Sequence, residues 1–283
     1  MLRYRLITGP ILIIALLGVV WFDWAMQCQN APPGLVLYLL AVLVTPLAAH
    51  EFTTLLRATG LKAQTWLNTT VAWMGLSLTF WWPHGIDSAN GVALIVSIMA
   101  LISVVSAITF TRGQTTEGVI ASIGGTLFVF AYLGCLAGLL LAIAHGHSAW
   151  WVAGVVAITK ACDSGAYFTG RALGKHKMIP WLSPGKTWEG AIGGVLAAIG
   201  VAALLIAAND AWLDTPLPWW MIPALGLGLA ISGQLGDLMM SLLKRGARLK
   251  DSSNILPGLG GLLDVLDSPL LVAPVAYWLL TGF

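Results

Sequence analysis

Long apolar segments recur along the chain from end to end, separated by short polar connections. Each is close to the roughly 20 residues that an α-helix needs to cross the hydrocarbon core of a bilayer. The pattern predicts an all-α, polytopic helical membrane protein with about nine transmembrane helices. The predicted spans are Leu6–Trp24, Gly34–His50, Trp66–Trp82, Gly91–Phe110, Val119–Ala144, Ala149–Phe168, Gly190–Ala208, Trp219–Leu243 and Leu262–Gly282.

The composition agrees with a chain that lies mostly within a bilayer. Of the 283 residues, 58% are hydrophobic and 9% are charged, whereas a soluble globular domain has about 25% charged residues. The apolar runs do not alternate in polarity as the strands of a membrane barrel do, so the sequence excludes that architecture. We divide the chain into N-terminal membrane helices, residues 1–118, and C-terminal membrane helices that carry the charged motifs, residues 119–283, within one integral membrane unit.

Lys and Arg residues gather on alternate connections between the predicted spans. The odd-numbered connections contain Asp87, Asp210 and Asp214 but neither Lys nor Arg. Because cytoplasmic loops are rich in Lys and Arg, we expect the N-terminus and the even-numbered connections to be cytoplasmic. The cations on which this expectation depends are Arg3, Arg5, Arg57, Lys62, Arg171, Lys175, Lys177, Lys186, Lys244, Arg245, Arg248 and Lys250.

A dense cluster of charge lies near the C-terminus, in Gly236–Ser268. This stretch holds four cations and four aspartates between two long apolar segments. Charged side chains resist burial in hydrocarbon, so a cluster of this size at a helix end indicates a functional site. Asp237, Ser241 and Lys244 are spaced i, i+4 and i+7, which places them on one face if the segment is helical.

A glycine-rich turn and two further aspartates complete this stretch. Asp264 and Asp267 lie three residues apart, and therefore on one face of the helix that begins there. Carboxylates hold metal cations, cations hold phosphates, and glycines expose the backbone, so the cluster is typical of a site for phosphoryl chemistry. The turn contains Pro257, Gly258, Gly260 and Gly261.

A second charged cluster occupies Thr159–Gly190. Lys160 and Asp163 lie i, i+3 inside an otherwise apolar span, where they are able to neutralise each other. Two interpretations of this pair stay open at this point. It is either a structural ion pair that fixes helix packing or the wall of a functional site.

The SPGKT segment at residues 183–187 suggests a phosphate-binding loop at first sight. A Walker A motif, however, requires a glycine at the position of Pro180. We therefore assign the segment a simpler role. Lys186 supplies a point charge for a polyphosphate, and Thr187 or Ser183 supplies a hydroxyl donor.

Both clusters resemble the motifs of the CDP-diacylglycerol synthases, or phosphatidate cytidylyltransferases. The family's C-terminal pattern runs S-x-x-K-R-x4-K-D, then P-G-H-G-G, then D-R-x-D, and the residues in register here are Ser241, Lys244, Arg245, Lys250, Asp251, Pro257, Gly258, Gly260, Gly261, Asp264 and Asp267. Its upstream patterns are matched by Lys160, Asp163, Ala166, Tyr167, Gly170, Gly174, Ser183, Pro184, Lys186, Thr187, Trp188, Glu189 and Gly190. The agreement covers residues 160–268, while Arg5–Gly9 and His50–Phe52 match more loosely.

The chain departs from the family pattern at two positions. Leu259 replaces the histidine of P-G-H-G-G, and Val265 replaces the arginine that follows the first aspartate. Leucine cannot donate a hydrogen bond to a phosphate, and valine removes a fixed cation. If either group is needed for turnover, the chain is slow, altered in substrate or inactive, whereas the retained acidic and basic residues favour activity.

The resemblance implies a nucleotidyltransferase of phospholipid biosynthesis that transfers CMP from CTP to phosphatidic acid, giving CDP-diacylglycerol and pyrophosphate. It implies Mg²⁺ as the cofactor, held by Asp237 and Asp264, with Asp163 and Asp267 as further metal or structural contacts. It implies catalytic roles for Asp237, Asp264, Lys186 and Lys244, and contacts to nucleotide or phosphate from Lys160, Ser183, Thr187, Ser241, Arg245 and Lys250. It further suggests the cell inner membrane, cytoplasmic catalytic loops and a homodimer, with no nucleic-acid partner.

Two other functions remain alternatives. A CTP-dependent kinase of a polyprenol or similar lipid alcohol would transfer the γ-phosphoryl group and release CDP. A transporter or a non-catalytic membrane paralogue is the other alternative, although transporters carry charge inside their spans and inverted repeats. Here the charge lies mainly at helix ends in the second half of the chain.

Overall fold

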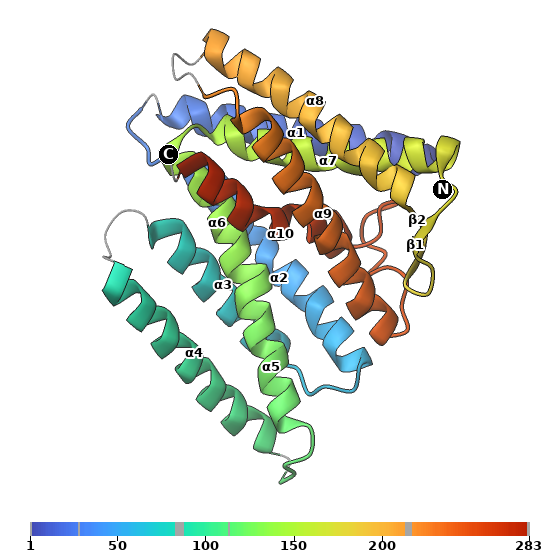
Figure 1. Ribbon diagram of the computed structural model, residues 1–283. Coiled ribbons are helices and arrows are strands. Elements are labelled where there is room, and N and C mark those ends of the chain that lie inside the picture. The colour runs from blue at the N-terminus through green and yellow to red at the C-terminus, as the bar shows by residue number, and fades with distance from the viewer. Residues whose placement is uncertain (1, 28, 83–87, 113, 213–216, 282–283) are drawn as a thin grey trace.

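The computed structural model describes residues 2–27, 29–82, 88–112, 114–212 and 217–281, and its elements are almost all helices (Figure 1). A helix occupies each of the ranges that the apolar pattern predicts, with its ends shifted by a few residues. The helical elements are α1 (Leu2–Gln27), α2 (Leu35–Ala58), α3 (Thr65–Trp81), α4 (Ser88–Thr111), α5 (Val119–Val129), the π-helical turn η2 (Phe130–Cys135), α6 (Leu136–Gly146), α7 (Ala149–Leu173), α8 (Trp188–Trp212), α9 (Met221–Gly246) and α10 (Leu262–Thr281). Asp87, Asp214 and Gly282, which the sequence predictions used, lie outside the described residues.

In the described part of the chain, 7 helical segments are long and apolar enough to cross a membrane. Two further helices fall outside this group. They are α3, which has 17 residues, and α7, which contains Lys160, Asp163 and Arg171. The predicted all-α, multi-pass membrane fold is therefore confirmed, while the number of nine crossings stays a prediction.

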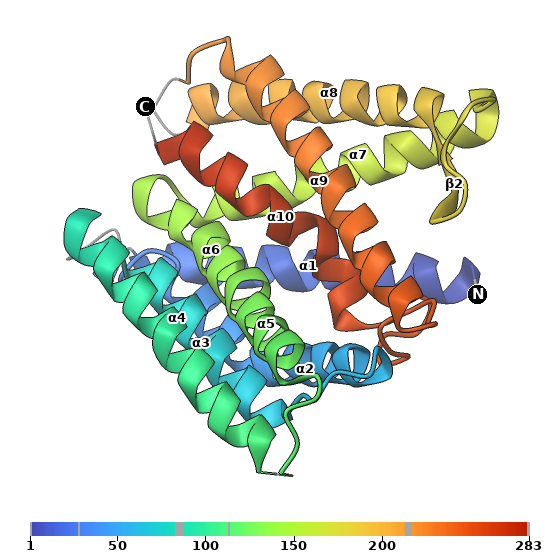
Figure 2. The same ribbon diagram turned by 60° about the horizontal axis from the view of Figure 1, so that its bottom comes forward.

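The helices form two groups that α9 and α10 connect. α1, α7 and α8 run side by side along one side of the molecule, and α2 to α6 gather on the other side (Figures 1 and 2). α9 packs against α8 and α10, and α10 packs against α6. Figure 2 shows that the start of α1, the loop before α8 and the end of α9 lie at the same end of the molecule.

α7 and α8 approach each other closely because small residues lie between them. A Cβ atom on Gly165 would lie 2.6 Å from the Cβ atom of Ala197, and one on Gly194 would lie 2.8 Å from the carbonyl oxygen of Cys162. Small residues of this kind let membrane helices bring their backbones together. The close approach holds the start of α8 beside the C-terminal half of α7, where the upstream charged cluster lies.

A short antiparallel hairpin, β1 (Lys177–Ile179) and β2 (Ser183–Thr187), joins α7 to α8. The sequence did not predict this hairpin, because the proline and glycine of SPGKT are both depleted in strands. Glu189, in the first turn of α8, supports it. Its carboxylate accepts hydrogen bonds from the backbone N–H groups of Lys175 and His176, each at 3.2 Å. The strand β2 ends at Thr187, and α8 begins at the next residue, Trp188.

The buried apolar side chains form two clusters, and each cluster combines both parts of the chain. One cluster contains Leu76 together with Ile158 and Leu229. The other contains Phe52 together with Leu263, and these two side chains are almost fully buried. The division of the chain at residue 118 stays a prediction.

Candidate active site

A cavity of about 570 Å³ lies where α7, the hairpin, α8, α9 and α10 meet. It brings the two charged clusters of the sequence together, although they are far apart along the chain. Eight of the twelve residues to which the sequence assigns catalytic, binding or metal-holding roles line it: Lys160, Asp163, Ser183, Lys186, Thr187, Asp237, Asp264 and Asp267. The cavity is therefore the candidate active site.

Lys186 connects the hairpin to α9 across this cavity. Its ammonium nitrogen lies 2.8 Å from Oδ2 of Asp237 and donates a hydrogen bond to the carbonyl oxygen of Gln234 at 3.2 Å. The Asp237 side chain is 36% exposed, so its carboxylate stays accessible from the cavity. The sequence had not singled out Gln234, which also lines the cavity.

Asp264 holds the loop between α9 and α10 in place. Its Oδ1 atom lies 2.6 Å from the ammonium nitrogen of Lys244. Its Oδ2 atom accepts hydrogen bonds from the backbone N–H groups of Ser252 and Gly261, both at 2.8 Å, and lies 2.9 Å from the Ser252 hydroxyl. The Asp264 side chain is 9% exposed, so most of its accepting capacity is already used within the protein.

Asp237 interacts electrostatically with two further carboxylates of the cavity lining. Asp237 repels the negative charges of both Asp163 and Asp267. Lys160 lies 3.1 Å from Asp163, which confirms the ion pair that the i, i+3 spacing predicted. Both members of this ion pair line the cavity, so the pair also forms part of the cavity wall.

No three His, Cys, Asp or Glu side chains in the described part of the chain stand close enough to hold a metal ion among themselves. A bound Mg²⁺ typically uses one or two carboxylates, with water and substrate phosphates completing its shell. The cavity offers this smaller donor set, since Asp237 is accessible and Asp163 and Asp267 lie near enough to interact with it electrostatically. The metal ligands stay a prediction.

Several predicted residues lie outside the cavity lining. Ser241 is half-buried on α9, and Lys250 is exposed in the loop that follows. Arg245 is exposed and donates a hydrogen bond to the carbonyl oxygen of Leu249 at 3.3 Å. Lys244 is buried beside Asp264. Their roles toward nucleotide or phosphate stay predictions.

Thr187 has a structural role in addition to its place in the cavity lining. Its hydroxyl oxygen accepts a hydrogen bond from the backbone N–H of Gly190 at 3.1 Å and so caps the start of α8. The two positions that depart from the family pattern, Leu259 and Val265, are half-buried, and neither belongs to the cavity lining.

The residue that sequence reasoning missed most clearly is Glu51 of α2. The sequence gives it no role beyond its place in the loosely matching segment His50–Phe52. In the structure it is 1% exposed and contacts the C-terminal loop, with Ser252, Ser253, Leu262 and Leu263 as its partners. The available signal was a lone carboxylate at the end of an apolar span, where charge is costly.

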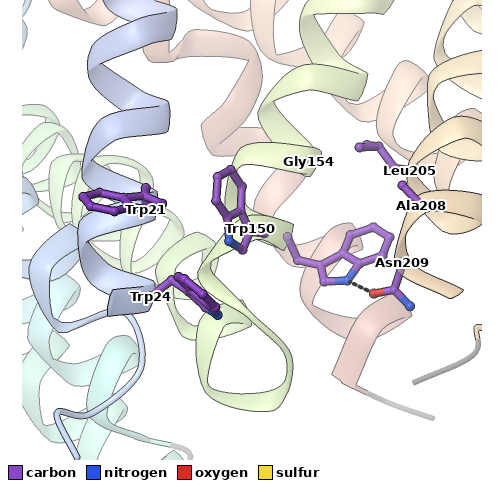
Figure 3. Close-up of a pocket in the computed structure, with 8 residues that line it drawn as sticks. Trp21, Trp24, Trp150, Gly154, Leu205, Ala208 and Asn209 are labelled. Atoms are coloured by element: carbon purple, nitrogen blue, oxygen red, sulfur yellow. Dashed lines mark hydrogen bonds between the residues drawn. The ribbon is translucent and has the colours of Figure 1, made fainter. Parts of the chain in front are cut away.

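A second cavity, of about 510 Å³, lies at the opposite ends of α7 and α8 (Figure 3). Tryptophans from α1 and α7 line it, and the indole N–H of Trp151 donates a hydrogen bond to Oδ1 of Asn209 at 3.0 Å. The lining, which includes no charged residue, consists of Trp21, Trp24, Trp150, Trp151, Gly154, Leu205, Ala208 and Asn209. Tryptophan is enriched where membrane helices meet the headgroup region, so we assign the chemistry to the charged cavity.

Comparisons with known proteins agree with the motif resemblance. The sequence matches the model of the cytidylyltransferase family over residues 3–283. It is 48% identical over 123 residues to the phosphatidate cytidylyltransferase of Bacillus subtilis, covering 43% of this chain and 44% of that protein. It is 38% identical over 172 residues to the phosphatidate cytidylyltransferase of Chlamydia trachomatis, covering 58% of this chain and 56% of that protein.

The alignments thus span about half the length of the curated relatives that the chain matches. The family model, in contrast, extends over almost the whole sequence and includes both charged clusters and the helices between them. The resemblance predicted from the motifs is therefore confirmed, and the chain belongs to the cytidylyltransferase family.

Proposed function

We propose that the protein is a phosphatidate cytidylyltransferase, which transfers CMP from CTP to phosphatidic acid. The observation that carries the proposal is a cavity in which cations and carboxylates from both charged clusters meet. Membership of the family and the names of the relatives support the same activity. The products are CDP-diacylglycerol and pyrophosphate.

Exposed aromatic and apolar side chains in the cavity lining and close to it in the sequence support a lipid substrate. Tyr167 lines the cavity and is 58% exposed, and its neighbour Phe168 is also exposed on α7. Trp188, which directly follows the cavity residue Thr187, and Ile192 are both exposed on α8. A lipid can therefore place its charged headgroup against polar side chains while its tails stay against apolar ones.

The reaction joins two anions, so catalysis rests mainly on positioning and on neutralising charge. An oxygen of the lipid phosphate bonds to the α-phosphorus of CTP, and the bond from that phosphorus to the bridging oxygen breaks. Pyrophosphate leaves with the electron pair of the broken bond. The ammonium group of Lys186, oriented by Asp237 and the Gln234 carbonyl, is placed to hold the phosphates. A general base is not required, because the attacking phosphate is already ionised.

The donor set of the cavity fits Mg²⁺, a hard cation that prefers oxygen ligands. Asp237 would hold it together with Asp163 or Asp267 and substrate oxygens, since each of these two carboxylates interacts electrostatically with Asp237. Asp264 is a poorer ligand than the sequence suggested, because its oxygens already accept contacts from Lys244, Ser252 and Gly261. When bound, the metal would screen the incoming phosphate and stabilise the leaving pyrophosphate.

We place the cavity on the cytoplasmic side of the cell inner membrane, where CTP is available. The alternation of Lys and Arg along the connections supports this orientation. The connections next to the cavity, residues 174–187 and 247–261, are both even-numbered in this scheme. The homodimer suggested by the resemblance stays a prediction.

The test is product formation by purified protein in detergent with CTP, phosphatidic acid and Mg²⁺. We expect CDP-diacylglycerol and pyrophosphate in equal amounts. Asp237→Asn removes the accessible carboxylate and should strongly reduce both products, whereas Glu117→Gln changes an exposed carboxylate outside the cavity and should have no effect. Release of CDP in place of pyrophosphate would reject the proposal in favour of a lipid kinase.

A further inference from the structure

Glu51 provides an N-terminal cap for α10 although 211 positions separate it from the start of that helix. Its Oε1 atom accepts hydrogen bonds from the backbone N–H of Leu262 at 3.0 Å and from the Ser253 hydroxyl at 2.6 Å. Its Oε2 atom accepts one from the backbone N–H of Leu263 at 2.9 Å. The first N–H groups of a helix have no partner within the helix, and a carboxylate at this end is favourable. One carboxylate from α2 thus accepts hydrogen bonds from two backbone N–H groups at the start of α10.

Ser252 connects Glu51 to Asp264. The Ser252 hydroxyl oxygen lies 3.0 Å from Oε2 of Glu51 and 2.9 Å from Oδ2 of Asp264. A hydroxyl carries one proton, so it donates to one of these carboxylates at a time. The backbone N–H of Ser252 keeps its own hydrogen bond to Asp264, at 2.8 Å. A continuous polar chain therefore runs from α2 to the cavity residue Asp264.

This arrangement requires a glycine at position 261. A Cβ atom there would lie 2.0 Å from the Ser252 hydroxyl oxygen and 2.6 Å from Oε2 of Glu51. Both distances are far shorter than any normal contact, so only glycine leaves room for the three groups. The glycine-rich turn therefore serves the contact between Glu51 and the loop.

The favourable cap of α10 does not by itself account for a carboxylate buried this deeply. None of the ion pairs in the described part of the chain involves Glu51, so N–H and O–H groups alone stabilise its charge. Taking a carboxylate out of water is costly, and apolar replacements of buried charges are often neutral or stabilising. What Glu51 adds is a fixed position for the loop and for the first turn of α10.

We infer that Glu51 is a positioning residue for the candidate active site. It holds residues 252–263 so that Asp264 pairs with Lys244 and Asp267 faces the cavity. Glu51 itself does not belong to the cavity lining and acts through the loop. The expected effect of Glu51 on turnover rests on the proposed function, whereas the expected effect of Glu51 on the position of the loop does not.

The test compares Glu51→Gln with Asp23→Asn, a matched control. Asp23 is also a carboxylate with 1% exposure that caps a helix, since it accepts hydrogen bonds from the backbone N–H groups of Gly34 and Val36 at the start of α2. It lies at the end of α1, far along that helix from the charged cavity. The two variants therefore make the same chemical change in similar surroundings, but only one change lies next to the loop.

Hydrogen–deuterium exchange in detergent is the readout that does not depend on activity. We expect Glu51→Gln to speed exchange at least tenfold in residues 252–264 and to leave the hairpin unchanged. Asp23→Asn should speed exchange only around residues 34–36. Ser253→Ala, which removes one hydrogen bond to Glu51 without changing the carboxylate, should give a smaller effect at the same residues as Glu51→Gln. Unchanged exchange in the loop of Glu51→Gln would overturn the inference.

Steady-state kinetics supply the second readout. In Glu51→Gln we expect kcat for CDP-diacylglycerol formation to fall at least tenfold with less than a threefold change in the KM for CTP, while Asp23→Asn keeps its kcat. A fall of kcat by the same factor in both variants would reduce Glu51 to a structural residue and overturn the inference. If the unchanged protein forms no CDP-diacylglycerol, the proposed function fails, and the exchange experiment still decides whether Glu51 holds the loop.

Discussion

The ammonium nitrogen of Lys186, on the strand β2, lies 2.8 Å from the carboxylate of Asp237 on α9. This ion pair joins two motifs that the sequence keeps about fifty residues apart. It also gives both groups a fixed position in the same cavity.

Replacing Lys186 by glutamine should strongly reduce turnover. The substitution removes a cation that is placed to hold phosphates and leaves Asp237 without its partner. Losing one such electrostatic contact typically costs about 10²–10³ in kcat. Steady-state assays with CTP and phosphatidic acid measure the effect. Lys175→Gln, an exposed cation next to the hairpin but outside the cavity lining, is the control, and equal losses in both variants would contradict the role of Lys186.

The requirement for Mg²⁺ should distinguish Asp237 from Asp264. Asp237→Asn replaces the accessible carboxylate by a neutral amide, so the Mg²⁺ concentration for half-maximal residual activity should rise about tenfold or more. Asp264→Asn should change this concentration less, because Asp264 is already engaged by Lys244 and by backbone N–H groups. For each variant, this concentration is measured by titrating activity with Mg²⁺ after a chelator has removed bound metal. A larger shift in Asp264→Asn would mean that Asp264 is the main ligand.

Replacing Lys244 by methionine should destabilise the protein. The substitution leaves the Asp264 carboxylate, which is 9% exposed, without its cation. Breaking a buried pair from one side costs about 3 kcal/mol or more. Thermal unfolding in detergent measures the change. The double variant with Asp264→Asn removes the stranded charge and should recover part of the lost stability, and a double variant less stable than Lys244→Met would count against this account.

Two glycines should respond in opposite ways to alanine. In Gly261→Ala the new Cβ atom meets the Ser252 hydroxyl and the Glu51 carboxylate, so we expect a lower unfolding temperature and a disturbed loop. Gly200 lies within α8 and has no neighbouring atom within 4 Å of an added Cβ. Alanine there should stabilise the helix by up to about 1 kcal/mol. Thermal unfolding of the two variants side by side tests the contrast, which a neutral Gly261→Ala would contradict.

Much of the fold could be predicted from the sequence because membrane helices are long and apolar. Each predicted apolar range contains a helix in the structure. The hairpin between α7 and α8 was missed because its two strands have 3 and 5 residues and the second contains proline and glycine. Patterns so short carry little information about strands.

The candidate site could be predicted only in part. Motif spacing identified both charged clusters, and the i, i+3 spacing gave the pair of Lys160 and Asp163. Spacing could not show that Lys244 pairs with Asp264, because the loop between α9 and α10 has to fold back first. Glu51 was missed for the same reason, since its partners lie more than 200 positions away in the sequence.

The most direct test of the account follows the phosphates of CTP. Purified protein in detergent receives phosphatidic acid, Mg²⁺ and CTP that carries a label on either the α- or the γ-phosphate. We predict that the α-label enters the lipid fraction, that the γ-label appears only in pyrophosphate, and that Asp237→Asn strongly reduces both. Transfer of the γ-label to a lipid, or full activity in Asp237→Asn, would contradict the account.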